Sequence, residues 1–332
     1  MNKFPFLLIC LFAIGFISCK KEQQAHLISD STITAADNLA TCNAVKPDTE
    51  NIQVFPATNA WNKDISASPV DTFSNQIIAK FASSIIHADF GSGTWAGAPI
   101  GIPYVVVCGT QQKYTVKFRA NNYDGNYGNE SDKGPYAIPL TASIEGNGNG
   151  DSHVIAVDKD SGILYELYNA SVNNGQWEAS SGAIFHFNTN KLRRKGWTSA
   201  DAAGLPIFAG LIRYDELAKG KIDHAIRFTL SSTNVYPGYI SPARHKVNST
   251  GQLHYSLPFG ARIRLKASYN ISGFSANNKI ILQAMKTYGL MLADIGSNMY
   301  ISGAPDSRWN NDDLHQMDKI HASDFEVVKF SN

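Results

Sequence analysis

Two carboxylates and a histidine near the middle of the chain are of the types that cleave glycosidic bonds. Asp151 and His153 lie just before one β-rich run, and Glu166 and Tyr168 lie on the next. Glycoside hydrolysis needs one carboxyl group to protonate the leaving oxygen and a second to attack the sugar or activate water. We therefore take Glu166 and Asp151 as the candidate catalytic pair, with His153 as an orienting group.

The pairing of the two runs decides whether these side chains meet. A hairpin that pairs Asp158 with Ile163 places His153 opposite Tyr168 and brings Glu166 to the same face. A slip of one residue moves Glu166 to the other face, and the turn does not decide the register. In a plainer interpretation, Glu166 faces solvent and His153 only starts a strand.

A second candidate is His224, which is followed by Ala225, Ile226, Arg227 and Phe228. Strand alternation puts His224 on one face with Ile226 and Phe228. A histidine among large apolar residues is either a hydrogen-bonded core residue or a desolvated general base. Both interpretations stay open.

A third candidate is the basic group Arg244, His245 and Lys246, which follows a proline. Arg244 would clamp a carboxylate or sulfate through two hydrogen bonds, while His245 or Tyr239 accepts a proton. A polysaccharide lyase requires that arrangement. The alternative is a basic surface loop.

Aromatic side chains provide candidate sugar platforms. Trp309 and Tyr300 together could stack on a pyranose ring, and Trp309, Trp95 and Tyr127 would serve a protein that only captures glycan. The alternative for Trp309 is burial against the final helix. We expect no metal and no cofactor, because the histidines and Asp151 lack the short spacings of metal ligands.

The elements that must position these residues are mostly short strands. Strands are expected at 104–108, 114–119, 153–158, 163–169, 183–187, 224–230, 262–267, 299–302 and 325–330. Helices are expected at 73–87, 198–203, 214–219 and 276–293, the last capped by Ser275. The pattern predicts a mainly β fold: a β-sandwich or jelly-roll-like single domain with a few decorating α-helices.

The N-terminus predicts export. Residues 1–18 combine Lys3 with an apolar run too short to cross a bilayer, as in a signal peptide. The run ends in Ile17-Ser18-Cys19, which resembles the lipobox of bacterial lipoproteins and implies lipidation of Cys19 after cleavage before it. An ordinary signal peptide is the alternative. Residues 19–43 then read as a disordered tether, and 44–332 as one β-rich domain.

Two further cysteines, Cys42 and Cys108, remain in an oxidising compartment. We predict that they form a disulfide that ties the end of the tether to the domain. Two independent buried thiols are the alternative.

Composition excludes some partners. The formal net charge is +1 with no blocks of like charge, so the chain lacks the basic surface of a nucleic-acid binder. Only 17% of residues are charged, while Gly, Asn, Ser and Thr are abundant. This surface suits a hydroxyl-rich ligand such as a polysaccharide or oligosaccharide, and we expect membrane contact only through the lipid anchor.

The stretch 145–324 resembles a family of secreted bacterial proteins whose function is unknown. The resemblance is carried by residues 153–158, 164–170, 196–206, 223–228, 242–245 and 288–294. It implies membership of that family and assigns no catalytic residue.

We therefore expect an exported lipoprotein, on the outer-membrane surface or the periplasmic face, that acts on extracellular polysaccharide as a glycoside hydrolase. The alternatives are a polysaccharide lyase using Arg244 and His245, a non-catalytic glycan-binding lipoprotein, and a structural envelope protein.

Overall fold

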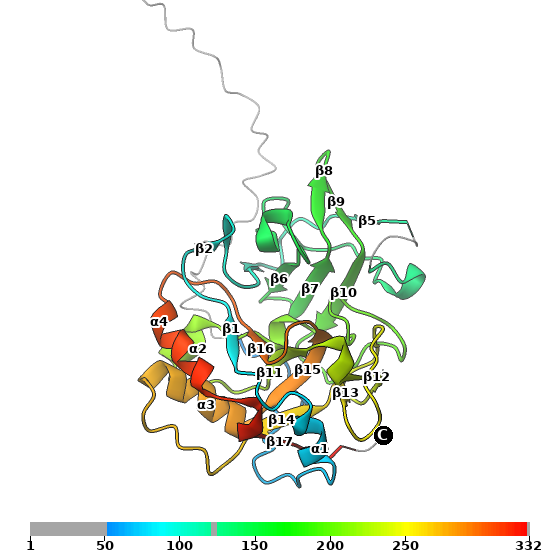
Figure 1. The fold of residues 1–332 in the computed structure, drawn as a ribbon. Helices are drawn as coiled ribbons and strands as arrows, with labels where there is room; N and C mark the ends of the chain where they lie inside the picture. The colour runs from blue at the N-terminus through cyan, green and yellow to red at the C-terminus, as the bar shows by residue number, and fades with distance from the viewer. Residues whose placement is uncertain (1–51, 121–124, 331–332) are drawn as a thin grey trace, which may run out of the picture. The chain divides into compact units, whose positions relative to one another are not determined.

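The computed structural model describes residues 52–120 and 125–330, all of which belong to one compact unit. Strands outnumber helices there and form several separate sheets (Figure 1). The prediction of a mainly β fold with a few helices is confirmed. The signal segment, Cys19, the tether and Cys42 lie outside the described residues. Within those residues, no helix combines the length and the apolar character needed to span a bilayer.

The first sheet has six strands in the spatial order β1-β16-β11-β15-β14-β17. Strand β1 runs parallel to β16, and β11 runs parallel to β15, whereas β14 is antiparallel to both neighbours. The sheet therefore contains both parallel and antiparallel pairs, and strand periodicity in the sequence predicts neither these directions nor the strand order. The strands are β1 (His87–Asp89), β11 (Ile226–Leu230), β14 (Arg262–Leu265), β15 (Leu290–Ile295), β16 (Tyr300–Ser302) and β17 (Phe325–Val327).

The second sheet has four strands in the order β10-β7-β6-β4. Its β6–β7 hairpin pairs Asp158 with Ile163 and Ile155 with Glu166. This register, which brings His153 and Glu166 to one face, is one of the two that the sequence allowed. The strands are β4 (Tyr104–Val107), β6 (Val154–Asp158), β7 (Ile163–Tyr168) and β10 (Ser181–His186).

Three smaller sheets complete the strands. The first is the β2–β3 hairpin, the second pairs β12 with β13, and in the third β9 lies between β5 and β8. Their bounds are β2 (Thr94–Trp95), β3 (Ala98–Pro99), β5 (Val116–Phe118), β8 (Ser171–Asn173), β9 (Gln176–Ala179), β12 (Val235–Tyr239) and β13 (Leu257–Phe259).

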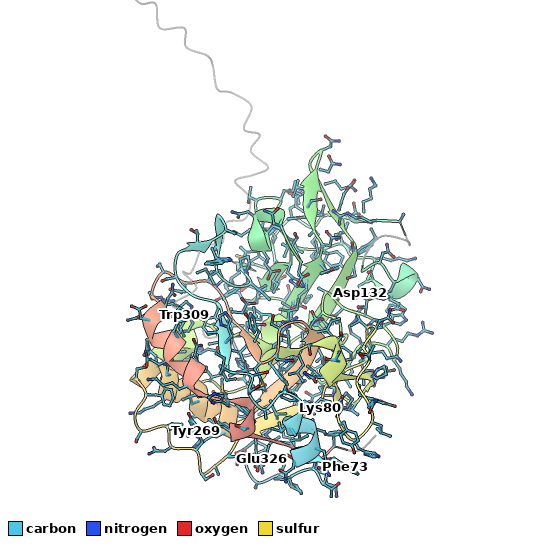
Figure 2. The ribbon with its side chains drawn as sticks, in the orientation of Figure 1. Phe73, Lys80, Asp132, Tyr269, Trp309 and Glu326 are labelled. Carbon is cyan, nitrogen blue, oxygen red and sulfur yellow. The ribbon has the colours of Figure 1, made fainter. Side chains whose placement is uncertain are left out.

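Two expected helices are shorter than predicted. Helix α1 covers only Ser74–Ala79, directly after Phe73 (Figure 2). The apolar spacing that suggested a helix to 87 fails because Ile85 forms a β-bridge with His321 and the chain then enters β1. Helix α3 (Ala276–Thr287) begins at its predicted Ser275 cap, whose hydroxyl accepts the backbone N–H of Asn278.

The C-terminal end of α3 was predicted wrongly. Gly289, with a φ of +74°, adopts the left-handed conformation that ends helices. The apolar residues after it form β15 instead, where they pair with β11. Helices α2 (Tyr214–Ala218) and α4 (Asn311–Leu314) are short.

No helix forms at 198–203. The hydroxyl of Ser199 instead accepts the backbone N–H of Asp201 and donates to the Leu205 carbonyl. Such side-chain hydrogen bonds compete with helix formation.

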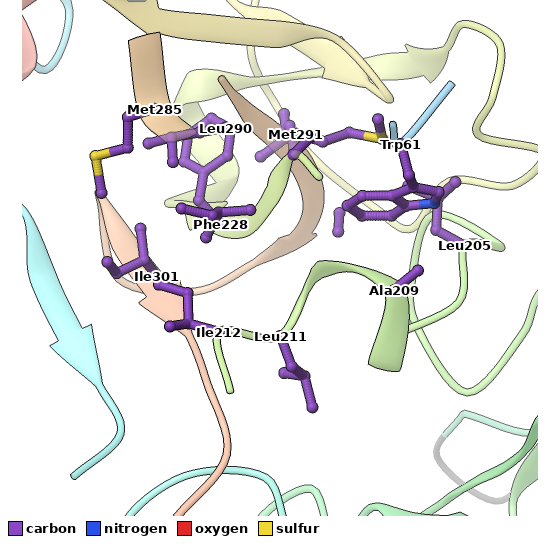
Figure 3. Close-up of a cluster of buried hydrophobic side chains, with 14 of the residues drawn as sticks. Trp61, Leu205, Ala209, Leu211, Ile212, Phe228, Met285, Leu290, Met291 and Ile301 are labelled. Atoms are coloured by element: carbon purple, nitrogen blue, oxygen red, sulfur yellow. The ribbon is translucent and has the colours of Figure 1, made fainter. Parts of the chain in front are cut away.

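Two buried clusters fill the interior. Ile155 and Val157 of β6 pack into the larger one, while Val154 and Ala156 pack into the smaller one on the opposite face. The four-stranded sheet is therefore buried on both faces, which explains its continuous apolar run. Figure 3 shows part of the larger cluster, where Phe228 of β11 lies among Leu290, Met285 and Ile301.

Candidate active site

A cavity of about 1010 Å³ opens beside β1, the β2–β3 hairpin, the 3₁₀ helix η3 (Glu145–Gly148) and α4. Three acidic residues, Asp89, Glu145 and Asp151, line it together with Trp95 and Tyr300. A concave site of this size suits a small molecule or a segment of a polymer. We call it the acidic cleft.

The β2–β3 hairpin presents Trp95 to solvent at 79% exposure. Ala96 and Gly97 form its two-residue turn, and both have positive φ, as tight hairpin turns require. The side chain of Asn147 donates to the Gly97 carbonyl at 2.8 Å. This hydrogen bond ties the turn to η3 and so restrains the hairpin that carries Trp95.

Strands β1 and β16 supply the sheet side of the cleft. Their parallel register pairs His87 with Tyr300, whose ring centroids lie 4.2 Å apart, and Asp89 with Ser302. Asp89 therefore lies at the end of β1, beside Ser302 of β16.

Glu145 and His153 form an ion pair behind the cleft wall. His153 Nδ1 lies 2.6 Å from Glu145 Oε2, and His153 Nε2 lies 3.1 Å from the Ala200 carbonyl oxygen. Both ring nitrogens face acceptors, so the imidazolium satisfies both while the neutral ring satisfies one. Burial lowers the pKa of His153, but the Glu145 carboxylate outweighs it and raises that pKa to about 9.

The pKa values of Glu145 and Asp89, which both line the cleft, are shifted in opposite directions. Burial raises the pKa of Glu145, but the charge and hydrogen bonds of His153 outweigh burial and lower it. Burial in the cleft wall raises the pKa of Asp89, and the carboxylates of Glu145 and Asp151 add to that rise. Asp89 is an exposed residue, while atoms of the surrounding wall displace part of the solvent that would stabilise its charge.

A buried arginine, Arg227, acts electrostatically on two residues of the cleft. The Arg227 guanidinium donates to both oxygens of Asp201, at 3.1 and 2.9 Å, and to Asp294 at 3.0 Å and Ser302 at 2.8 Å. Its charge lowers the pKa of Asp89 and Glu145. Burial and the Asp201 carboxylate together raise the pKa of Asp294. This buried cluster therefore acts on two carboxyl groups of the cleft through its charge, although Arg227 does not line the cavity.

A second cavity of about 300 Å³ adjoins the acidic cleft. Pro99, Glu145 and Gly146 line both, and Tyr104 and Tyr214 line the second alone. Glu145 therefore borders both cavities.

Several predicted residues meet in this region. Asp151 and Tyr300 line the cleft, and His153 lies behind it, 5.5 Å from Tyr168 between ring centroids. Trp95, a candidate for glycan capture, lies on the cleft rim.

Glu166 lies elsewhere. It is fully buried, and its two carboxylate oxygens accept the backbone N–H groups of Ile207 and Phe208 at 3.0 and 2.8 Å. Burial raises its pKa to about 7, against these hydrogen bonds. A carboxylate with both oxygens occupied and no access to the cleft does not suit the catalytic role predicted for it.

His224 is buried in a separate ion pair. Its Nε2 lies 2.9 Å from Glu216 Oε1, which also accepts from Arg213 at 2.6 Å. Its Nδ1 lies 2.8 Å from the Ala225 carbonyl oxygen. This arrangement matches the open alternative of a hydrogen-bonded core histidine.

Arg244 and His245 line neither of the two cavities. Arg244 Nε donates to the Arg193 carbonyl at 3.0 Å, and His245 Nδ1 lies 2.8 Å from the Ala202 carbonyl oxygen. The Tyr127 ring lies 4.7 Å from that of His245. The pair is therefore engaged with backbone groups of its own neighbourhood.

Trp309 is buried, with its indole N–H donating to the Ala304 carbonyl and its ring edge-on to Phe90 and Tyr214. It is part of the core under α4 and does not form a platform with Tyr300. Cys108 is disulfide-bonded. Its predicted pairing with Cys42 stays a prediction, because Cys42 lies outside the described residues.

Sequence reasoning missed Asp89, Glu145 and Arg227. Asp89 was hidden because the preceding residues were assigned to a helix, and Glu145 because it lies in a Gly/Asn-rich loop. Arg227 carried a usable signal: a cation within an apolar strand is seldom buried without paired carboxylates.

The described residues contain no group of three or more His, Cys, Asp or Glu side chains that could hold a metal ion. Comparisons with protein-family models, curated proteins and solved structures give no match. The function is therefore inferred from the geometry and charge of the acidic cleft.

Proposed function

We propose that the acidic cleft binds an extracellular glycan and hydrolyses a glycosidic bond in it. The proposal depends on one observation: Asp89 and Glu145 line the same open cavity, and their pKa values are shifted in opposite directions. Glycosidases use such a pair, one protonated acid and one ionised carboxylate.

Each residue then has a role. Asp89, with its raised pKa, donates a proton to the leaving oxygen. Glu145 stays ionised because His153 is its partner, and it attacks the anomeric carbon or activates water. Trp95 would stack on a sugar ring, as exposed indoles do with amphipathic ligands.

The charge of the cleft limits the substrate. Three carboxyl groups line it, and its lining residues include no lysine or arginine. Uronates and sulfated sugars would be repelled. A neutral glycan or an amino sugar fits better, and the adjoining second cavity favours a polymer over a monosaccharide.

The test is incubation of the mature protein with neutral, amino-sugar and acidic polysaccharides, followed by assay of new reducing ends. Activity on a neutral or amino-sugar polymer is expected, with at least a hundredfold loss in Asp89→Asn and Glu145→Gln, as for removal of a general acid or base. Asp160→Asn, at the exposed turn of the β6–β7 hairpin, is the matched control. Undiminished activity in both cleft variants would refute the assignment.

Non-catalytic glycan capture is the second candidate, favoured by the exposure of Trp95. In that case oligosaccharides bind, Trp95→Ala abolishes binding, and no reducing ends appear. The predicted lyase would instead release unsaturated products that absorb in the ultraviolet and would depend on Arg244 and His245. Incorporation of labelled lipid into the chain, and its loss in Cys19→Ser, tests the proposed lipid anchor.

A further inference from the structure

A separate cavity of about 440 Å³ carries the opposite charge. It lies at the end of β10, between the loop 132–134 and the segment 191–197. We call it the basic pocket. Its lining residues are Asp132, Lys133, Gly134, Ile184, Phe185, His186, Lys191, Leu192, Arg193, Arg194 and Trp197.

Hydrogen bonds connect the segments that frame the pocket. Arg193 is buried, and its guanidinium donates to Asp132 at 2.5 Å and to the Glu130 carbonyl at 2.8 Å. Asp132, labelled in Figure 2, also accepts the backbone N–H of Ile184 in β10. These bonds join the three segments that form the walls, and they neutralise Asp132 with Arg193.

Three cations in the pocket are not neutralised in this way. Lys133, Lys191 and Arg194 are exposed, and in the described part of the chain none of them forms an ion pair with a carboxylate. The Arg194 guanidinium lies 5.4 Å from the Trp197 ring centroid. Stacking on an indole orients the planar guanidinium, which then presents a fork of donors suited to carboxylate or sulfate.

The walls are not only cationic. Ile184, Phe185, Leu192 and Trp197 add apolar surface. A bare inorganic anion would not use these groups, and a flat lipid surface would not enter a concave pocket. A sugar ring offers an apolar C–H face for the apolar wall and an attached anionic group for the cations.

We propose that the basic pocket binds an acidic sugar, one that bears a carboxylate or a sulfate group. The site is independent of the acidic cleft, which would repel such a ligand. The protein would then hold an anionic glycan at one place while the cleft engages a neutral or cationic one.

The experiment is titration calorimetry of the mature protein with tetragalacturonate and a heparin tetrasaccharide, with maltotetraose as the neutral control. At least one acidic oligosaccharide should bind, while maltotetraose should not. Arg194→Gln should weaken that binding at least about tenfold, as expected for loss of one charge-assisted contact. Lys195→Gln alters an exposed cation next to the pocket that does not line it, and should leave affinity within about twofold.

Other outcomes overturn the proposal. The assignment fails if neither acidic oligosaccharide binds. It also fails if Lys195→Gln weakens binding as much as Arg194→Gln, or if maltotetraose binds equally well. Inorganic phosphate binding as tightly as the oligosaccharides would reduce the pocket to a simple anion site. Binding to phosphatidylglycerol vesicles in the absence of any oligosaccharide binding would assign it to the membrane. Arg194 lines the basic pocket but neither of the cavities that Glu145 borders. The hydrolytic activity can therefore fail without affecting this binding result.

Discussion

The charge of His153 acts on both Glu145 and Glu166, yet the two carboxyl groups lie in contrasting surroundings. Glu145 reaches the cleft with a lowered pKa, whereas Glu166 is sealed between the sheets with a raised one. Their difference comes from the partner: Glu145 has a cation, and Glu166 has two neutral N–H groups. A buried carboxylate with an abnormal pKa is therefore not by itself a catalytic site, because access decides what its proton can do.

The largest expected effect concerns a buried ion pair, that of Arg227 with Asp201. Arg227→Met leaves Asp201 buried and unpaired, which should cost about 3–5 kcal/mol in the free energy of unfolding. Urea denaturation followed by circular dichroism measures this loss. Arg308→Met, in an ion pair with Asp306 at the surface, should cost less than about 1 kcal/mol. Equal losses in the two variants would contradict the difference between buried and exposed pairs.

The next effect concerns the ion pair of Glu145 with His153 at the cleft. The folded-state pKa of His153 is about 9, above its unfolded value near 6.5. Its stabilisation is complete below pH 6.5 and is lost as pH rises through 9, by roughly 3 kcal/mol. Denaturation at pH 6 and pH 9.5 should show this fall in wild type and a much smaller one in Glu145→Gln. His186→Gln, on an exposed residue, should retain the fall; a fall of the same size in Glu145→Gln would argue against the ion pair.

An effect of similar size distinguishes Glu166. Its folded-state pKa of about 7 exceeds its unfolded value near 4.5, so its contribution favours folding at low pH. That contribution declines by roughly 3 kcal/mol as pH rises from 4.5 to 7. Glu166→Gln should remove the decline and add about 1–3 kcal/mol of destabilisation, since one N–H group loses its acceptor.

Unfolding free energies of wild type and Glu166→Gln at pH 5 and pH 7.5 provide the measurement. Glu326→Gln, on the outer strand β17 and paired with Arg264, serves as the control and should keep the wild-type pH dependence. An unchanged slope in Glu166→Gln would mean that Glu166 is ionised throughout this range in the folded protein.

The smallest expected effect is at the cleft rim. Trp95→Ala should change the unfolding free energy by no more than about 0.5 kcal/mol, because the ring is largely exposed. The same substitution at the buried Trp309 should cost about 3–5 kcal/mol. Thermal or urea unfolding compares the two. A large loss in Trp95→Ala would show that the indole serves the hairpin and not a ligand.

Much of the local structure could be predicted from the sequence. The β6–β7 hairpin has strong β-formers on both sides of a turn, and Ser275 marks the start of α3 as a cap should. The end of α3 was missed because an apolar run after Gly289 fits either a helix or a buried strand, and only pairing with β11 decides between them.

The candidate site was predicted only in part. Asp151, His153, Tyr300 and Trp95 were identified by residue type, whereas their neighbours Asp89 and Glu145 come from segments far apart in sequence. The mixed strand order of the six-stranded sheet and the turn at η3 bring them together. Neither is encoded in a short-range pattern, so no periodicity or spacing could have joined these two carboxylates.

Asn147 holds the turn of the β2–β3 hairpin, and Asn311 holds the chain just before the hairpin through three hydrogen bonds with Ser92. A loop held at both places has little conformational entropy left to lose when a ligand arrives. Trp95 would then belong to a preorganised binding site. Its selectivity would be set by shape, and the rate of association would be limited mainly by diffusion and orientation.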